Sequence, residues 1–364
     1  MDRLAYCGHP FQLYGVEEQR LCGGRAEGMR VLEVKNGLGL NFTVLLDRGC
    51  GIARLSYRGI NCSFMSASGL RRPEYYEHGG GDQSFLRSFH AGFLTTCGLF
   101  NVGVACSDGG EQTCLHGDLD NIPVESWHWW TGEDGNLHIE ALIRVEQIFY
   151  HKAVLRRHFT VGLERSFLTI EDRVTNTGST VCPVMILYHM NMGYPLLDED
   201  TRLFINSTSY QPRTEIAASD AARWNVITAP EHNYQERCYY HSFRGTTAAG
   251  HEGRSAIAAV YQPKHDLGLA VSFDPENLPF FTQWKQCGYR DYALGLEPGN
   301  SHCDGRNLMR RQGMLREMGP GEQADFHVQV DFFSGEDSFN SIREQWATTA
   351  DGVPALNSKL PDWL

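Results

Sequence analysis

Several features that mark other classes of protein are missing from this chain of 364 residues. Residues 1–10 hold no apolar stretch long enough for a signal peptide. No segment approaches the roughly 20 apolar residues that a membrane-spanning helix needs. No run of Lys and Arg occurs, and the formal net charge is −12, from 32 basic and 44 acidic residues. Because such a charge repels polyanions, the sequence argues against nucleic acids and membrane surfaces as partners.

The eleven cysteines also lack a pattern, because no Cys-x-x-Cys pair occurs among them. Zinc ribbons and thioredoxin-type redox sites both depend on such a pair. Together with the missing export signal, this absence predicts reduced thiols and a cytoplasmic location.

What the sequence does contain is an alternation of apolar and polar residues with a period of two, interrupted by Gly and Asn. We expect strands at 31–35, 41–47, 52–57, 137–145, 153–161 and 167–176. Helical periodicity is confined to one short segment, 338–346. Segments 198–220 and 229–253 are irregular and are predicted to be long loops.

No change of composition, low-complexity segment or internal repeat marks a domain boundary. The sequence therefore predicts an all-β fold in one antiparallel domain over residues 1–364. Within it, residues 1–30 form an N-terminal extension and residues 338–364 a C-terminal tail with a short helix. The oligomeric state is open, and a homodimer is one option.

Three distant motifs each offer a group suited to proton transfer on a sugar: Leu115-His116-Gly117, Tyr188-His189-Met190-Asn191 and Gly295-Leu296-Glu297-Pro298. Opening a cyclic sugar requires one group that takes the proton of the anomeric hydroxyl and another that protonates the ring oxygen. An imidazole has an ordinary pKa close to neutral pH. The apolar neighbours of Glu297 favour desolvation, which raises the pKa of a carboxyl group and makes it a stronger base. A core histidine and a solvated glutamate are the plainer interpretations of the same residues.

The order His, His, Glu among strand-like segments resembles the aldose 1-epimerases of the galactose mutarotase-like superfamily, roughly from Val31 to Phe333. This resemblance implies a large twisted antiparallel β-sandwich with an open concave face. It also implies an isomerase that interconverts the anomers of a sugar without a cofactor or metal. Glu297 would act as general base, His189 as general acid to the ring oxygen, and His116 as a ligand of the sugar near the anomeric oxygen. The family usually has His-Gly-Gly where this chain has His116-Gly117-Asp118, and this departure bears on the substrate.

Six further residues are predicted to bind the sugar or sugar acid: Arg87, His90, Thr96, Asn191, Trp284 and Lys285. The family has a sugar-binding arginine near Arg87, whose guanidinium can hold two hydroxyls or a carboxylate. The indole face of Trp284 suits the C–H face of a pyranose, although a tryptophan in a β protein is more often part of the core. Lys285 can pair with Glu297 or with a carboxylate of the substrate.

Other interpretations stay open. Two histidines and one carboxylate can hold a zinc ion, so a metal bound by His116, His189 and Glu297 is conceivable, although the resemblance implies metal-free chemistry. One rival function is an epimerase or isomerase that acts at another carbon of a sugar or sugar acid. A second rival is a carbohydrate-binding protein without activity.

Overall fold

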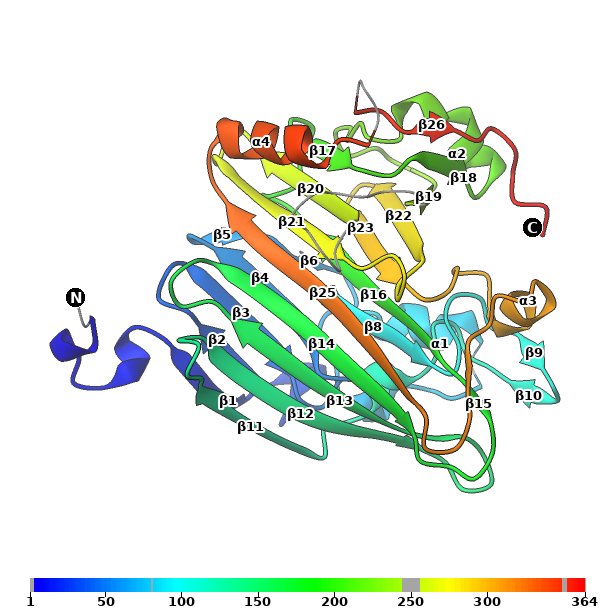
Figure 1. Cartoon of the computed structure of the whole chain (residues 1–364), viewed down its shortest axis with the longest axis horizontal. Coiled ribbons are helices and arrows are strands. Elements are labelled where there is room, and N and C mark those ends of the chain that lie inside the picture. Colours follow the sequence, from blue (N-terminus) through cyan, green and yellow to red (C-terminus); the bar gives the residue numbers. More distant parts are fainter. Residues whose placement is uncertain (1–2, 80, 244–255, 349–351, 364) are drawn as a thin grey trace.

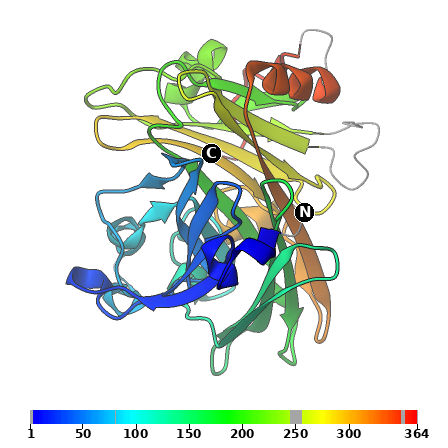
Figure 2. The ribbon, with the colours of Figure 1, turned by 90° about the vertical axis from the view of Figure 1, so that its left-hand side faces the viewer.

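Two large β-sheets form the body of the protein, as the computed structural model of residues 3–79, 81–243, 256–348 and 352–363 shows (Figures 1 and 2). The larger sheet has twelve strands, and β5 lies beside β4 off its main path. Its main strands, in spatial order, are β1 (Gly15–Arg20), β2 (Arg30–Lys35), β3 (Leu40–Leu45), β4 (Gly51–Tyr57), β8 (Leu94–Leu99), β16 (Met185–Met192), β23 (Tyr292–Gly299), β22 (Phe280–Cys287), β19 (Arg237–Ser242), β18 (Ser209–Pro212) and β26 (Ala355–Leu356). The remaining strand, β5, spans Ile60–Asn61.

The second sheet has eight strands, and each is antiparallel to its neighbours. In spatial order they are β11 (Ser126–Thr131), β12 (Leu137–Glu146), β13 (Lys152–Val161), β14 (Phe167–Asn176), β25 (Gln323–Phe333), β21 (Leu267–Phe273), β20 (Ala256–Gln262) and β17 (Arg202–Ile205). Three small sheets pair β6 (Phe64–Met65) with β7 (Ala91–Gly92), β9 (Ser107–Asp108) with β10 (Glu111–Gln112), and β15 (Cys182–Pro183) with β24 (Glu317–Met318).

Helices are short in the described part of the chain. The α-helices are α1 (Asp82–Ser88), α2 (Glu215–Ser219), α3 (Arg306–Arg311) and α4 (Glu336–Trp346). Turns of 3-10 helix occur at Arg3–Tyr6, Pro10–Gln12, Gly24–Ala26, Pro73–Tyr75, Leu119–Asn121 and Ala221–Arg223. None of the helices in these ranges is long and apolar enough to cross a membrane.

The alternating sequence pattern explains how the sheets pack. Along β12, every second side chain is buried, beginning with Leu137 and Ile139. These residues join one hydrophobic core with residues of the larger sheet such as Phe42 and Ile186. Burial of a large apolar side chain contributes about 1.5–3 kcal/mol, so the shared core holds the two sheets face to face.

A buried ion pair of the second sheet also makes hydrogen bonds to the side of the larger sheet. The guanidinium of Arg157 on β13 makes two hydrogen bonds to Asp172 on β14, of 2.8 and 2.5 Å. It also donates to the carbonyl oxygen of Cys50, beside the larger sheet, at 3.1 Å. The hydroxyl of Tyr188 on β16 donates to Asp172 at 2.8 Å. Tyr188 therefore points into the core, and its neighbour His189 points to the opposite face.

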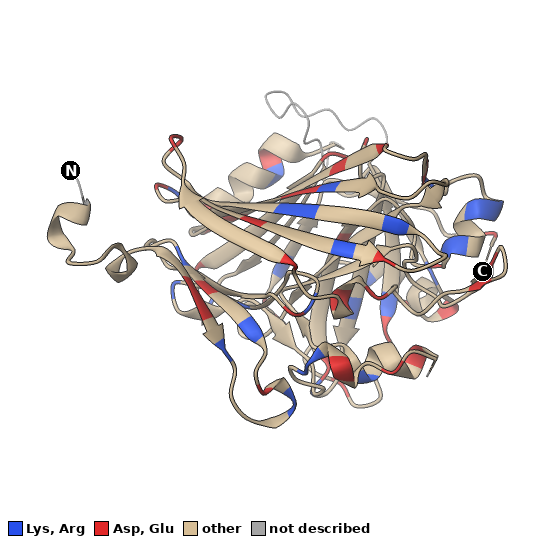
Figure 3. Ribbon diagram, turned by 90° about the horizontal axis from the view of Figure 1, so that it is seen from below, with Lys and Arg blue, Asp and Glu red and all other residues tan. Residues whose placement is uncertain are grey.

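Basic and acidic residues both occur along the strands of the second sheet (Figure 3). Arg156 lies 2.6 Å from Glu140, and Arg173 lies 2.7 Å from Asp325. These two basic residues are therefore paired with acidic neighbours on the adjacent strand.

The all-β prediction is confirmed, and each of the six expected strands is present as β2, β3, β4, β12, β13 or β14. The short helix expected at 338–346 is α4. Both loop predictions are wrong: 198–220 contains β17, β18 and α2, and the described part of 229–253 contains β19. Residues 244–253 of that prediction lie outside the described residues. These strands have only four to six residues. Their conformation depends on pairing with neighbouring strands, and a local sequence pattern does not encode that pairing. The domain limits stay a prediction.

Candidate active site

His189 and Glu297 lie on neighbouring strands in the middle of the larger sheet. On β16 and β23, Leu187 pairs with Gly299 and Met190 pairs with Leu296, so the register sets His189 opposite Glu297. Nε2 of His189 lies 3.4 Å from Oε1 of Glu297. Both side chains are buried, with 8% and 2% of their surface exposed. The sheet thus brings together two titratable groups that are 108 positions apart in the chain.

The carboxylate of Glu297 has room because residue 295 is a glycine. A Cβ atom at Gly295 would lie 2.3 Å from Oε1 of Glu297 and 2.9 Å from Cβ of Trp284. Any larger residue at this position would therefore displace the carboxylate or the indole. This contact gives a physical reason for the glycine in the Gly-Leu-Glu motif.

His116 reaches the same place from a loop rather than a strand. The backbone of His116 has φ +59° and that of Gly117 has φ +71°, so the chain turns sharply here. A Cβ atom on Gly117 would come within 2.3 Å of the carbonyl oxygen of Gly98, and only glycine fits so close to β8. The ring centroids of His116 and His189 are 5.8 Å apart. The structure thus brings the three predicted catalytic residues together.

A cavity of about 450 Å³ lies over these residues. Its wall combines aromatic and aliphatic side chains with a few polar groups, as ligand sites in proteins commonly do. The described residues that line it include Phe85, Phe89, His116, His189, Arg213, Glu236, Thr282, Trp284, Glu297 and Cys303.

Burial shifts the pKa of each catalytic candidate toward its neutral form. Burial lowers the pKa of His189 to about 4, and the side chain of Asn191 opposes part of this shift. For His116, burial and the nearby His189 and Arg213 lower the pKa to about 3. Burial, reinforced by the negative charge of Glu236, raises the pKa of Glu297 well above 4.5. Burial therefore favours a protonated Glu297 beside a neutral His189.

Two of the predicted sugar-binding residues lie at the site. The indole of Trp284 lines the cavity, 5.4 Å from the ring of His189, and its Nε1 donates to Glu236 at 2.8 Å. Asn191 is fully buried behind His189, and its Nδ2 donates to the carbonyl oxygen of His189 at 3.0 Å. Asn191 is placed to support the histidine rather than to touch a ligand.

The other four predicted sugar-binding residues, like Asn191, do not line the cavity. Arg87 is exposed on α1 and lies 3.8 Å from Glu77, whereas Phe85 and Leu86 of the same helix face the cavity. His90 is fully buried, with Nδ1 4.0 Å from Asp120.

Thr96 and Lys285 lie on strands of the larger sheet, but the alternation of side chains along each strand directs these two away from the cavity. Thr96 pairs with Tyr188 and shares its core-facing side of the sheet. Lys285 follows Trp284 on β22 and points the opposite way, where its Nζ donates to Asp220 at 3.1 Å. Lys285 therefore does not pair with Glu297.

Sequence reasoning missed Arg213, the one Lys or Arg among the described residues that line the cavity. Its Nε donates to Asp304 at 2.9 Å. Asp304 also accepts hydrogen bonds from the hydroxyl of Tyr240 at 2.7 Å and from Nε1 of Trp363 at 3.1 Å. Arg213 follows β18, in a segment predicted to be a loop, and no local signal in the sequence marks it.

The described residues hold no group of three or more His, Cys, Asp and Glu that is arranged to bind a metal ion. His116, His189 and Glu297 therefore do not form such a group. Whether the reaction needs a metal is not decided by this finding, and metal-free chemistry stays a prediction.

Comparison with known proteins agrees with the fold. No curated protein matches this sequence. A structure from Klebsiella pneumoniae subsp. pneumoniae, described as a "putative aldose 1-epimerase", superposes with a TM-score of 0.85 at 21% identity, covering 95% of this chain and 90% of that one. A galactose mutarotase-like protein from Clostridium acetobutylicum gives 0.62 at 12% identity, covering 89% of this chain and 100% of that one. Galactose 1-epimerase from Lactobacillus acidophilus gives 0.58 at 13% identity, with coverage of 89% and 100%.

At these identities the structural likeness establishes the fold alone, which is that of the galactose mutarotase-like proteins. A protein family described as "Domain of unknown function (DUF4432)" matches residues 26–332. Because this match covers most of the sequence, the chain belongs to the DUF4432 family.

Proposed function

We propose that this protein is an aldose 1-epimerase-like isomerase that interconverts the anomers of a sugar. The observation that carries this proposal is the buried pair of His189 and Glu297, whose side chains lie 3.4 Å apart in the cavity. One proton held between two such groups is what the reaction needs, because one oxygen of the sugar gains a proton as another loses one.

The reaction begins with the cyclic sugar in the cavity. One member of the pair removes the proton of the O1 hydroxyl and the other protonates the ring oxygen, so that the bond from C1 to the ring oxygen breaks. An open-chain aldehyde forms, and rotation by about half a turn around C1–C2 presents its other face. Ring closure returns both protons, because each group then acts in the opposite sense.

The sequence assigned the base to Glu297 and the acid to His189. Burial of both groups favours a proton on Glu297 and a neutral His189 in the empty site, which corresponds to the reverse assignment. Since opening and closing exchange the two roles, a single shared proton serves both directions. Oε1 of Glu297 has no hydrogen-bond partner among the described residues and is available to a sugar hydroxyl.

Arg213, Trp284 and His116 surround the pair and form the proposed sugar-binding surface. The guanidinium of Arg213 supplies fixed donors for hydroxyl oxygens. The ring of Trp284 offers an apolar face for the C–H groups of a pyranose. Arg213 thereby takes the role that the sequence gave to Arg87.

Polarimetry tests the proposal directly. Purified protein should speed the approach of freshly dissolved α-D-glucose or α-D-galactose to anomeric equilibrium. Glu297→Gln keeps the shape of the side chain and removes its proton chemistry, so the rate should fall by a factor of about 10² or more. The matched control is Glu171→Gln on the outer face of the second sheet, which should retain full activity.

The same sample in D₂O separates the rival functions. Anomer exchange leaves every carbon-bound hydrogen in place, so deuterium appearing on carbon in the NMR spectrum would identify an epimerase or isomerase that acts at another carbon. Binding of a panel of aldoses, ketoses and uronates without faster anomer exchange would identify a carbohydrate-binding protein without activity.

A further inference from the structure

A second cavity, of about 700 Å³, lies beside the candidate active site and is larger than it. The two cavities share a wall formed by the segment before and after His116. Leu115 and His116 face the first cavity, whereas Cys114, Gly117 and Asp118 face the second. Nothing in the proposed reaction uses this second space.

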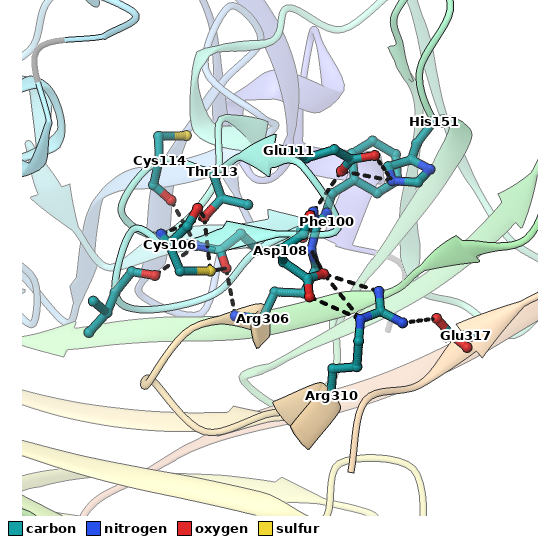
Figure 4. Close-up of polar contacts among 12 residues, drawn as sticks. Phe100, Cys106, Asp108, Glu111, Thr113, Cys114, His151, Arg306, Arg310 and Glu317 are labelled. Carbon is teal, nitrogen blue, oxygen red and sulfur yellow. Dashed lines mark hydrogen bonds and ion pairs between the residues drawn. The ribbon is translucent and has the colours of Figure 1, made fainter. Parts of the chain in front are cut away.

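A buried network of charges fixes one side of the second cavity (Figure 4). Arg306 at the start of α3 has only 2% of its side chain exposed and donates to Asp108 at 2.8 Å and to Glu111 at 2.6 Å. Arg310 lies 3.0 Å from the same Asp108. These contacts fasten the β9–β10 hairpin to α3.

The network extends to the turn between β12 and β13. Nε2 of His151 lies 3.1 Å from Oε1 of Glu111, and its ring packs 5.0 Å from that of Phe100. Glu111 is therefore held from two sides, by Arg306 and by His151. The cavity wall is built from three chain segments that ion pairs hold in place, which limits the cost of ordering it around a ligand.

The lining has the chemistry of a site for a neutral hydroxylated molecule. Phe100, Tyr76 and Tyr150 contribute aromatic surface. Gln112 and Gln147 line the same space, and both residues are exposed. Planar amides can serve adjacent hydroxyls as donor and acceptor, and aromatic faces suit the C–H face of a sugar ring.

The charges of the cavity argue against an anionic ligand. Among the described residues, Arg306 is the one arginine that lines the cavity, and it already pairs with Asp108 and Glu111. Asp118 lines the same cavity, where His78 is its basic neighbour and no lysine is present in the described lining. A phosphorylated or carboxylated sugar would therefore meet acidic groups without an unpaired arginine or a lysine to balance its own charge.

We infer that the second cavity binds a neutral sugar, so that each chain carries two sugar sites separated by the segment of His116. A ligand in the second site would contact Gly117 and Asp118, which follow the histidine directly. The carbonyl oxygen of His116 accepts a hydrogen bond from the backbone N–H of Gly98 at 3.0 Å. The backbone N–H of His116 donates to the carbonyl oxygen of Gly103 at 2.8 Å. The segment that separates the two sites is therefore held to the β8 side by backbone hydrogen bonds of His116.

Equilibrium dialysis with radiolabelled D-galactose tests this inference on the whole chain. The expected result is two bound molecules per chain for the unchanged protein. A variant with Gln112→Ala, Gln147→Ala and Tyr150→Ala should bind one molecule per chain and keep its rate of anomer exchange at low galactose. The control Ile148→Ala lies in the same turn, is 74% exposed and does not line the cavity, so it should bind two.

The comparison between the unchanged protein and the triple variant decides the inference. Equal numbers of bound molecules in the two proteins would overturn it, because the second cavity would then hold no galactose. If the unchanged protein binds one molecule and the triple variant binds none, the second site stands and galactose binding at the candidate active site fails, so the inference and the proposed function can fail independently.

Discussion

Nε2 of His189 and Oε1 of Glu297 face each other across 3.4 Å, and burial shifts their pKa values in opposite directions. An exposed histidine and glutamate at this distance would form an ion pair at neutral pH. Here desolvation opposes charge on both, so the neutral pair with the proton on Glu297 is favoured. The buried pair therefore combines a protonated carboxyl group with a neutral imidazole, which is what the proposed transfer of protons to and from a sugar requires.

Gly295→Ala should abolish most activity without unfolding the protein. The new methyl group would lie 2.3 Å from the present position of Oε1 of Glu297, so the carboxylate must rotate away from His189. Because misplacement by about 1 Å can cost 10²-fold, we expect a loss of that order in kcat. Polarimetry measures the loss, and circular dichroism checks the fold.

The matched control is Gly319→Ala, where the nearest atom to the new Cβ is 3.4 Å away and φ is ordinary. Unchanged activity in Gly295→Ala would show that the position of the carboxylate does not matter to the reaction.

The pH profile should be bell-shaped for kcat/KM. As pH rises through about 4, His189 loses its proton and becomes able to accept one from the sugar, so activity increases. At higher pH, Glu297 loses its proton, and activity decreases with an apparent pKa well above 4.5. Rates of anomer exchange between pH 3 and 10, corrected for buffer catalysis, give both limbs. A profile that is highest below pH 4 would contradict the neutral pair.

Most of the fold follows from the sequence, because alternation over nine or ten residues, as in β12 and β13, is a strong local signal. The proposed catalytic trio of His116, His189 and Glu297 is also within reach of sequence reasoning, through motifs whose residues are adjacent in the chain. The glycines of these motifs are informative because His116-Gly117 and Gly295-Leu296-Glu297 each need a residue without a side chain for a steric reason.

The rest of the site depends on tertiary structure. Lys285 and Trp284 are neighbours in sequence, and only the register of β22 shows which of them faces the cavity. Arg213 enters the site because β18 pairs with β19 and because Asp304 holds its guanidinium. Both causes involve residues far away in sequence, so no local pattern could distinguish Arg213 from an ordinary surface arginine.

Removal of divalent metal should leave the proposed anomer exchange unchanged. The proposed steps move protons between side chains and sugar oxygens and require no Lewis acid. Activity is measured after exhaustive dialysis against EDTA, and again with Zn²⁺, Mn²⁺ or Mg²⁺ added back. If the dialysed protein is inactive and one ion restores it, the scheme based on His189 and Glu297 is wrong. An isomerase in which a metal polarises an open-chain carbonyl would then replace it.

Asp304→Asn should weaken substrate binding more than it slows the chemistry. Asp304 touches no substrate in the proposed scheme, but its carboxylate fixes Arg213 through a hydrogen bond of 2.9 Å to Nε. The amide keeps the shape of the side chain and loses its charge, so the guanidinium becomes less well positioned. A contact made equally in the ground state and the transition state affects KM and leaves kcat nearly unchanged. We expect KM to rise about tenfold, equivalent to about 1.4 kcal/mol.

Two further variants separate positioning from a general loss of structure. Trp363→Phe removes one donor to Asp304 and should raise KM in the same direction by a smaller factor. Asp362→Asn changes an exposed neighbour of the same charge and should leave both constants unchanged. A fall in kcat with an unaltered KM in Asp304→Asn would mean that Arg213 acts on the transition state alone, and its proposed role in holding the sugar would then be wrong.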